Sequence, residues 1–286
     1  MTMAVQYLQT NPAWEPERLL RSPLFAPLHP ALQHLVGQPF PDLAAWNSLL
    51  DEHYLGIRVH SGHLLRFVAQ AHGRLAFESQ YEPRCYLNGE VQTREHNWHD
   101  LFNALVWLVF PRAKAAINLR HYQALQGAHD GHSQRGRVRD MATLLDESGV
   151  IVVSADKMLG ELLRGFRWKE LFWQHRQRVR EAMGFYVFGH GLHEKMLRPY
   201  VGMTGQGLLL DVEPAFFTWP LVEQMAHVDQ RVAAYLADPA HCRSTRELQP
   251  VPLLGVPGWS EDNERESYYD NAAYFRPRRG QQALAL

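Results

Sequence analysis

The chain has 286 residues, of which 46% are hydrophobic and 21% are charged, and its formal net charge is −1. A chain of this length can bury a core without disulfides or a structural metal, and the near-zero charge argues against recruitment by nucleic acid or an acidic membrane. The longest apolar run, 101–110, is too short to span a bilayer, and the N-terminus lacks a signal-peptide pattern. We therefore expect a soluble cytoplasmic protein.

Proline is frequent in the first fifty residues, where it keeps helical segments short. We expect residues 1–50 to pack as a proline-rich segment on a single globular domain that covers 1–275. The chain becomes rich in proline again from residue 249, which favours an extended strap along the surface. Residues 276–286 are expected to form a disordered tail.

Short β-hairpins are predicted where apolar and aromatic runs flank turn residues. The expected hairpins are 57–59 with 64–68, 81–87 with 90–94 across the Asn88-Gly89 turn, and 141–146 with 150–153. A further strand is expected at 185–188, and the polar, glycine-containing stretch 126–137 is expected to be a surface loop.

Helices are predicted from apolar periodicity, caps and terminating prolines. The expected helices are 31–36, 43–54, one that starts at Thr93 or Asn97 and runs to about residue 110, 113–125, 157–164 after an Asp156 cap, 168–183, 190–198, and 215–236 beyond Pro220. Hairpins mixed with helices, without regular βαβ alternation, predict an α+β fold: a mostly helical, single compact domain with several short β-hairpins.

Histidine carries the strongest functional signal in the sequence. Among 16 histidines, four pairs have a spacing of three residues, where random placement would give about one. An acidic residue directly follows two of these pairs, in the motifs His96-x-x-His99-Asp100 and His190-x-x-His193-Glu194.

Helical geometry places the polar members of the first motif together. His96, His99, Asp100 and Asn103 fall within an arc of about 100° on one helix face, and the opposite face is apolar. The second motif repeats this arrangement at a helix start. Neutral imidazoles and carboxylates from two helices suit zinc, iron or manganese.

Structural interpretations of the same residues stay open. Asn97 is a candidate N-cap, in which case Asp100 only closes an interaction like a capping box. Glu194 is placed to pair with Arg198 four residues on. A buried histidine is also more often part of a hydrogen-bonded core than a metal ligand.

Further acids and bases lie near these motifs. Asp140, Asp146 and Glu147 either belong to ordinary turn chemistry or add a ligand or general base to the site. Arg94 and Arg112 are candidates to bind an anionic substrate group, although such residues more commonly form solvated surface. The sequence has no Walker loop, dinucleotide-binding glycine motif, serine-hydrolase elbow or paired CxxC, so nothing supports those enzyme classes.

Several short runs of the sequence are specific enough to compare with known families. The most specific is Asn97 to Leu105, which reads NWHDLFNAL. The other runs are Tyr81-Glu82-Pro83-Arg84, Thr93-Arg94, Phe110-Pro111-Arg112, Arg139-Asp140, Asp146-Glu147-Ser148-Gly149, Phe188-Gly189-His190, Glu194-Lys195, Pro252-Leu253-Leu254-Gly255 and Phe275-Arg276-Pro277. Together they resemble a bacterial family catalogued as domain of unknown function family 3025. The resemblance extends over about residues 50 to 277 and implies no particular activity.

The resemblance also ranks the candidate residues, because it implies that other residue types occupy the positions of His96 and His193. The better candidates that remain are His99, Asp100, Asn103, His190 and Glu194.

The leading hypothesis is a metal-dependent enzyme, with hydrolysis of a small anionic substrate as the favoured reaction. The expected metal ligands are His99, Asp100, His190 and Glu194. The expected base or extra ligand comes from Asp140, Asp146 or Glu147. The expected substrate-binding residues are Arg94, Asn103 and Arg112.

The alternative hypothesis is a non-catalytic ligand-binding or adaptor protein in which the same residues form a buried polar network. An open pocket that brings His99, Asp100, His190 and Glu194 within about 5 Å of one another would favour the metal site. Bound iron would suit oxygen chemistry instead of hydrolysis.

Overall fold

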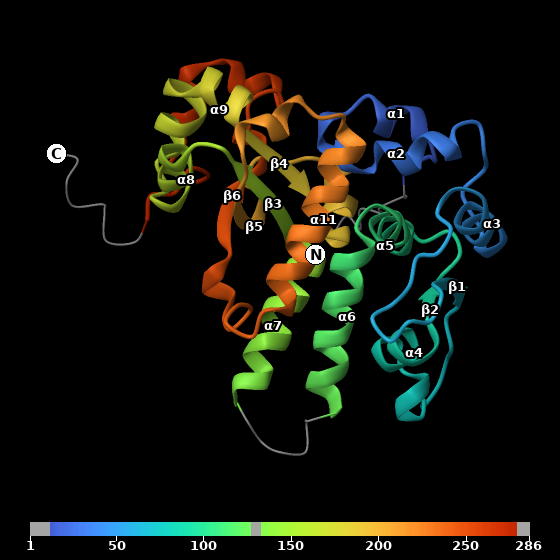
Figure 1. The fold of residues 1–286 in the computed structure, drawn as a ribbon. Helices are drawn as coiled ribbons and strands as arrows, with labels where there is room; N and C mark the ends of the chain where they lie inside the picture. The colour runs from blue at the N-terminus through green and yellow to red at the C-terminus, as the bar shows by residue number, and fades with distance from the viewer. Residues whose placement is uncertain (1–11, 127–132, 279–286) are drawn as a thin grey trace, which may run out of the picture.

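A four-stranded mixed sheet forms the centre of the computed structural model, which describes residues 12–126 and 133–278 (Figure 1). The strand order is β4-β3-β5-β6, with bounds Met183–Val187, Gly149–Ser154, Thr204–Asp211 and Gln249–Pro252. β3 is parallel to β5, whereas β4 and β6 run antiparallel to their neighbours. All six residues of β3 are buried, as expected for an apolar strand covered on both faces.

Helices surround this sheet and position the candidate site. Figure 1 shows α6, α7 and α11 side by side, with α8 and α9 together at the other end of the sheet. α5 packs against α10, and α10 packs against α7. The bounds are Trp98–Val109 for α5, Pro111–Gln126 for α6, Ser133–Ser148 for α7, Lys157–Arg164 for α8, Arg176–Ala182 for α9, His190–Met196 for α10 and Leu221–Ala237 for α11.

A smaller unit lies beyond α6, on the side away from α8 and α9 (Figure 1). It contains the two-stranded parallel sheet of β1 and β2 together with α3 and α4. The bounds are Pro16–Leu20 for α1, His29–Leu32 for α2, Leu43–His53 for α3, Arg66–Ala69 for β1, Tyr81–Asn88 for α4 and Glu90–Thr93 for β2. The proline-rich segment joins the main core through buried side chains such as Leu28 and Leu32.

The hairpin predicted over 81–94 is wrong in its first half. Residues 81–88 form α4, and Gly89, with φ of +75°, ends that helix in the left-handed conformation instead of turning a hairpin. The strand at 90–93 is confirmed, but its partner is β1, in parallel. A Cβ at Gly89 would lie 2.1 Å from the Leu64 carbonyl oxygen, so close backbone approach also requires glycine there.

The hairpin predicted over 141–153 is wrong for the same kind of reason. α7 continues through these residues to Ser148, and Met141, Ala142 and Leu145 are buried at helical spacing. The predicted strand at 150–153 is confirmed as β3. The predicted loop 126–137 is helical from Ser133 onward, while 127–132 lie outside the described residues.

Most of the other helix predictions are confirmed. Asn97 and Asp156 cap α5 and α8 through their side chains, as expected. The helix expected over 168–183 is divided, because a π-helical turn at Glu170–Gln174 precedes α9. The first predicted hairpin reduces to one bridge between Arg58 and Leu64.

The α+β class is confirmed, and one hydrophobic core extends from Leu19 to Phe275. No helix within the described ranges combines the length and the hydropathy needed to cross a membrane. Most of the predicted disordered tail, 279–286, lies outside the described residues.

Candidate functional site

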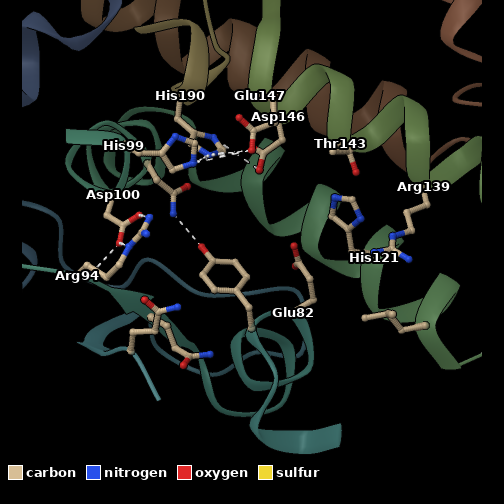
Figure 2. Close-up of a pocket in the computed structure, with 15 residues that line it drawn as sticks. Glu82, Arg94, His99, Asp100, His121, Arg139, Thr143, Asp146, Glu147 and His190 are labelled. Atoms are coloured by element: carbon tan, nitrogen blue, oxygen red, sulfur yellow. Dashed lines mark hydrogen bonds and ion pairs between the residues drawn. The ribbon is translucent and has the colours of Figure 1, made fainter. Parts of the chain in front are cut away.

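A polar cavity of about 340 Å³ opens where α5, α7 and α10 face α4, α6 and the end of β2. Figure 2 shows that His99, Glu147 and His190 gather at one end, with Glu82, His121 and Arg139 farther along. The lining residues are Gln70, Tyr81, Glu82, Gln92, Arg94, His99, Asp100, Asn103, His121, Leu125, Arg139, Thr143, Asp146, Glu147 and His190.

Three potential metal ligands converge in this cavity. His99 Nε2 lies 3.0 Å from His190 Nε2, and Glu147 Oε1 lies 3.8 Å from the first nitrogen and 3.6 Å from the second. Neighbouring ligand atoms around a small divalent ion with bonds of about 2 Å have similar separations. His99, Glu147 and His190 therefore form a group that could hold a metal ion, and we call it the triad.

A carboxylate stands behind each histidine of the triad. Glu194 Oε2 lies 3.2 Å from His99 Nδ1, and Asp146 Oδ2 lies 3.8 Å from His190 Nδ1. The Glu194 contact is within hydrogen-bond range, so it fixes the His99 ring as second partners commonly fix metal-binding histidines. The Asp146 contact is longer than a hydrogen bond, and the buried His190 Nδ1 has no hydrogen-bond partner among the described residues. The arrangement aims the Nε2 atom of each ring into the cavity.

The His190 side is deeply buried. Its side chain is 7% exposed, and Asp146 Oδ1 accepts a hydrogen bond from Lys114 Nζ at 2.5 Å. Burial lowers the pKa of His190 to about 3, with the Lys114 charge adding to this and the Asp146 charge opposing it. Burial also opposes ionisation of Asp146, but Lys114 and His190 outweigh it, so the pKa of Asp146 is lowered. A neutral imidazole results, which is the form that binds metals.

Glycine brings the start of α10 against the end of α7. A Cβ at Gly189 would lie 2.5 Å from the Ser148 amide nitrogen, and a Cβ at Gly191 would lie 2.3 Å from Glu147 Oε2. Any larger residue at position 191 would occupy the space of the Glu147 carboxylate. The Gly-His-Gly sequence thus places His190 and Glu147 in contact.

Asp100 fulfils another role in this geometry. Its Oδ2 accepts hydrogen bonds from the backbone N–H and Nε of Arg94, and its Oδ1 accepts one from Arg94 Nη2, at distances of 2.7–2.9 Å. The pair fixes the connection from β2 to α5. Asp100 lines the cavity, but its carboxylate is directed to Arg94 and the triad takes Glu147 as its acidic member.

The other residues expected at the site divide between the cavity and the surface. Asn103 lines the cavity and donates from Nδ2 to the Tyr81 hydroxyl at 2.8 Å. Asp140 is exposed and does not line the cavity. Arg112 lies in a separate apolar depression, and its backbone N–H donates to Asp229 on α11.

The remaining histidines of the two motifs lie away from the triad. His193 is completely buried between the rings of Phe25 and Phe102, and its Nε2 lies 3.2 Å from the Val187 carbonyl oxygen. His96 is exposed beside Phe40 and has a φ of +53°. Each motif thus contributes one histidine to the site.

Sequence reasoning missed the cavity wall supplied by α4 and α6. From these helices, Tyr81, Glu82, His121 and Leu125 line the cavity. Lys114, Asn118 and His121 are buried on α6 at spacings of four and three residues, which is the signal of one polar helix face. Asn118 Nδ2 donates to Glu82 Oε2 at 2.6 Å. Reading 81–87 as a strand concealed the roles of Tyr81 and Glu82.

Comparison with protein-family models gives one match, to the family described as "Protein of unknown function (DUF3025)", over residues 65–279. Searches of curated proteins and of solved structures gave no match. The matched region includes every residue of the triad and of the cavity wall.

Proposed function

Because the chain belongs to the DUF3025 family, whose activity is uncharacterised, we propose its function from the geometry of the site: a metal-dependent enzyme, with hydrolysis as the reaction. In this proposal His99, His190 and Glu147 hold one divalent ion, with zinc, iron and manganese as the candidates. Asp146 and Glu194 orient the two imidazole rings.

One observation carries the proposal. Three ligand atoms from α5, α7 and α10 converge on the wall of an open cavity, and both histidines are backed by a carboxylate. A structural zinc site has four protein ligands and is closed, whereas a catalytic site commonly has three and an open position. The number of protein ligands and the adjoining cavity favour the catalytic type.

The chemistry follows from these ligands. A divalent ion held there would polarise a substrate oxygen and lower the pKa of a coordinated water, which is what hydrolysis at neutral pH requires. Asp146 lies 3.8 Å from His190 Nδ1, close enough to favour the imidazole electrostatically, while Lys114 balances the charge of Asp146. Asp140 has no part in this proposal, because it is exposed and outside the cavity.

The arginine side chains in and near the cavity determine where an anionic group of the substrate could bind. Arg94 already donates two guanidinium N–H groups to Asp100, and Arg112 lies outside the cavity. Arg139 is exposed at the cavity wall and forms no ion pair with the residues that the structure describes. We therefore propose a small polar substrate whose anionic group, where present, binds at Arg139.

Metal analysis tests the first part of the proposal. We expect one equivalent of zinc, iron or manganese in protein purified without a tag, and loss of that metal in His99→Ala, His190→Ala and Glu147→Gln. His60→Ala, at an exposed turn, is the matched control and should retain the metal. Metal-independent melting of the wild type and absence of metal would favour the non-catalytic ligand-binding alternative.

A hydrolysis screen tests the second part. Metal-loaded protein is assayed on chromogenic esters, amides and phosphoesters, with Glu147→Gln as the matched variant. Turnover that requires both the metal and Glu147 is expected. Stoichiometric zinc without turnover on any of these bonds would refute the hydrolase and leave the metal site, whereas bound iron would redirect the search to oxygen chemistry.

A further inference from the structure

Four carboxyl groups line the cavity, and three of them have a basic partner. Asp100 pairs with Arg94, and Asp146 pairs with Lys114. Glu147 faces the two histidines of the triad. Glu82 is the exception, because it forms no ion pair with any residue in the described ranges.

Hydrogen bonds from Asn118 hold Glu82 in place, but no ion pair with a described residue offsets the charge of its carboxylate. Asn118 Nδ2 donates to the Glu82 carbonyl oxygen at 3.0 Å and to Oε2 at 2.6 Å. Oε1 accepts no hydrogen bond from the described part of the chain. Burial raises the pKa of Glu82, and the nearby His121 and the Asn118 hydrogen bond oppose that shift. His121 and Lys114 are near enough to lower the pKa of this carboxyl, but neither forms an ion pair with it.

Two buried amide oxygens also lack a donor among the described residues, one on the cavity wall and one on the residue that contacts Glu82. Asn103, which lines the cavity, is 6% exposed, and its Oδ1 has no hydrogen-bond partner among the described residues. Asn118 is 3% exposed, and its Oδ1 likewise has none. Buried polar atoms in native proteins are almost always hydrogen-bonded, so unpaired acceptors around a cavity indicate a ligand that brings donors.

We propose that Glu82 binds a protonated amine of the substrate, so that the substrate class is small molecules that carry an ammonium group and a bond hydrolysed at the triad. An ammonium group supplies positive charge and three N–H donors, which match a carboxylate without an ion-pair partner among the described residues, in a cavity where amide acceptors also lack donors. This inference rests on the proposed function, because the other end of the substrate is placed at the metal.

The experiment uses hydroxamates, which chelate a metal through one end and can extend a second group into the cavity. The aminated probes are the hydroxamates of glycine, β-alanine and γ-aminobutyric acid. Their matched controls are propionohydroxamate, butyrohydroxamate and valerohydroxamate, in which a methyl group replaces the amine. Affinities for the zinc-loaded full chain are measured by calorimetry for wild type, Glu82→Gln and Glu78→Gln.

We expect at least one aminated probe to bind about ten- to a hundredfold more tightly than its methyl counterpart, as a buried charge-assisted hydrogen bond requires. Glu82→Gln should abolish that gain, because glutamine retains the shape and the Asn118 contact but not the charge. Glu78→Gln, an exposed change four residues earlier, should leave the gain intact. Equal melting temperatures check that each variant is folded.

The outcomes separate this inference from the proposed function. Methyl hydroxamates that bind as well as every aminated partner would overturn the ammonium site and leave the metal site standing. A gain that persists in Glu82→Gln would also overturn it. If no hydroxamate binds the zinc-loaded protein, the proposal of an open metal position is refuted. The ammonium site is then tested independently by ligand-observed NMR, which compares the binding of propylamine with that of propanol in wild type and Glu82→Gln. Binding of propylamine that exceeds that of propanol only in wild type would support the site, and equal binding would overturn it.

Discussion

Each histidine of the triad has a carboxylate near its Nδ1 atom, but the two histidines differ in how far they are exposed to solvent. His190 belongs to an inner half, with Asp146 behind it and Lys114 behind Asp146, and the side chains of these residues are 4–16% exposed. His99 belongs to an outer half, with Glu194 behind it, and these side chains are 31% and 45% exposed. One ligand is thus held in a nearly dry environment and the other beside solvent.

Because of this difference in exposure, we expect the two halves to contribute differently to stability and to ligand binding. Electrostatic interactions are strong and unpaired charges costly where water is excluded, while exposed pairs are screened. The inner half should therefore determine both the stability of the fold and the preorganisation of the site. The outer half should permit His99 to adjust when a ligand enters.

The largest expected effect on stability comes from removing the positive charge of Lys114, which pairs with Asp146. Lys114→Met should lower the free energy of unfolding by about 3–5 kcal/mol, because it leaves a buried carboxylate without its cation. Glu194→Gln in the outer half should cost less than about 1 kcal/mol. Urea denaturation of both variants measures the contrast.

A double variant identifies the cause of that loss. Lys114→Met combined with Asp146→Asn removes both charges and should recover at least half of the lost stability, since no unpaired charge remains. A double variant as unstable as the single one would indicate that the contact of the Lys114 ammonium group with the Trp107 ring, 5.6 Å from its centroid, rather than the pairing with Asp146, stabilises this half.

The next effect concerns the contact between the two helices. Gly191→Ala places a methyl group where Glu147 Oε2 lies, so the carboxylate must move away from His190. We expect zinc affinity to fall about a hundredfold, as loss of one ligand requires, with little change in unfolding free energy because alanine favours helix. Competition with a chromophoric chelator measures the affinity, and wild-type affinity in this variant would exclude Glu147 as a ligand.

A smaller effect compares the two orienting carboxylates directly. Asp146→Asn, made together with Lys114→Met to keep the charge balanced, should lower zinc affinity about tenfold or more. Glu194→Gln should lower it by less, because solvent can replace an exposed hydrogen-bond partner. Equal losses in the two variants would show that burial does not distinguish the halves.

Helical spacing was sufficient to predict part of the site. It placed His99 and Asn103 on one face of α5, and the predicted strand-to-helix junction placed His190 at the start of α10. The contact between His99 and Glu194 spans 95 residues, and no spacing rule can anticipate such a contact. Only the packing of α10 on α5 creates it.

The errors had local physical causes. Asn88-Gly89 favours a type I′ turn, but a glycine that can adopt positive φ also ends a helix, and α4 uses it in that way. The predicted hairpin placed Asp146 at the end of a strand and Glu147 in the turn, whereas both occupy the last turn of α7. The expectation that Asp100 binds the metal stays a prediction, and its sequence position does not reveal that its carboxylate pairs with Arg94.

The last effect is the response of stability to pH at His193, a buried histidine outside the triad. Burial lowers the pKa of His193 to about 3, although the Val187 carbonyl opposes the shift. Between pH 6.5 and 3 the unfolded chain binds a proton there that the folded chain does not, so stability falls as pH falls. The expected slope is about 1.4 kcal/mol per pH unit for this residue.

His193→Gln should remove that slope near pH 5, whereas His60→Ala, exposed in the fold, should not. Unfolding free energies measured by urea at pH 7, 6 and 5 provide the comparison. Parallel profiles for wild type and His193→Gln would mean that the folded and unfolded chains bind a proton at His193 equally, which would contradict its burial as a neutral ring.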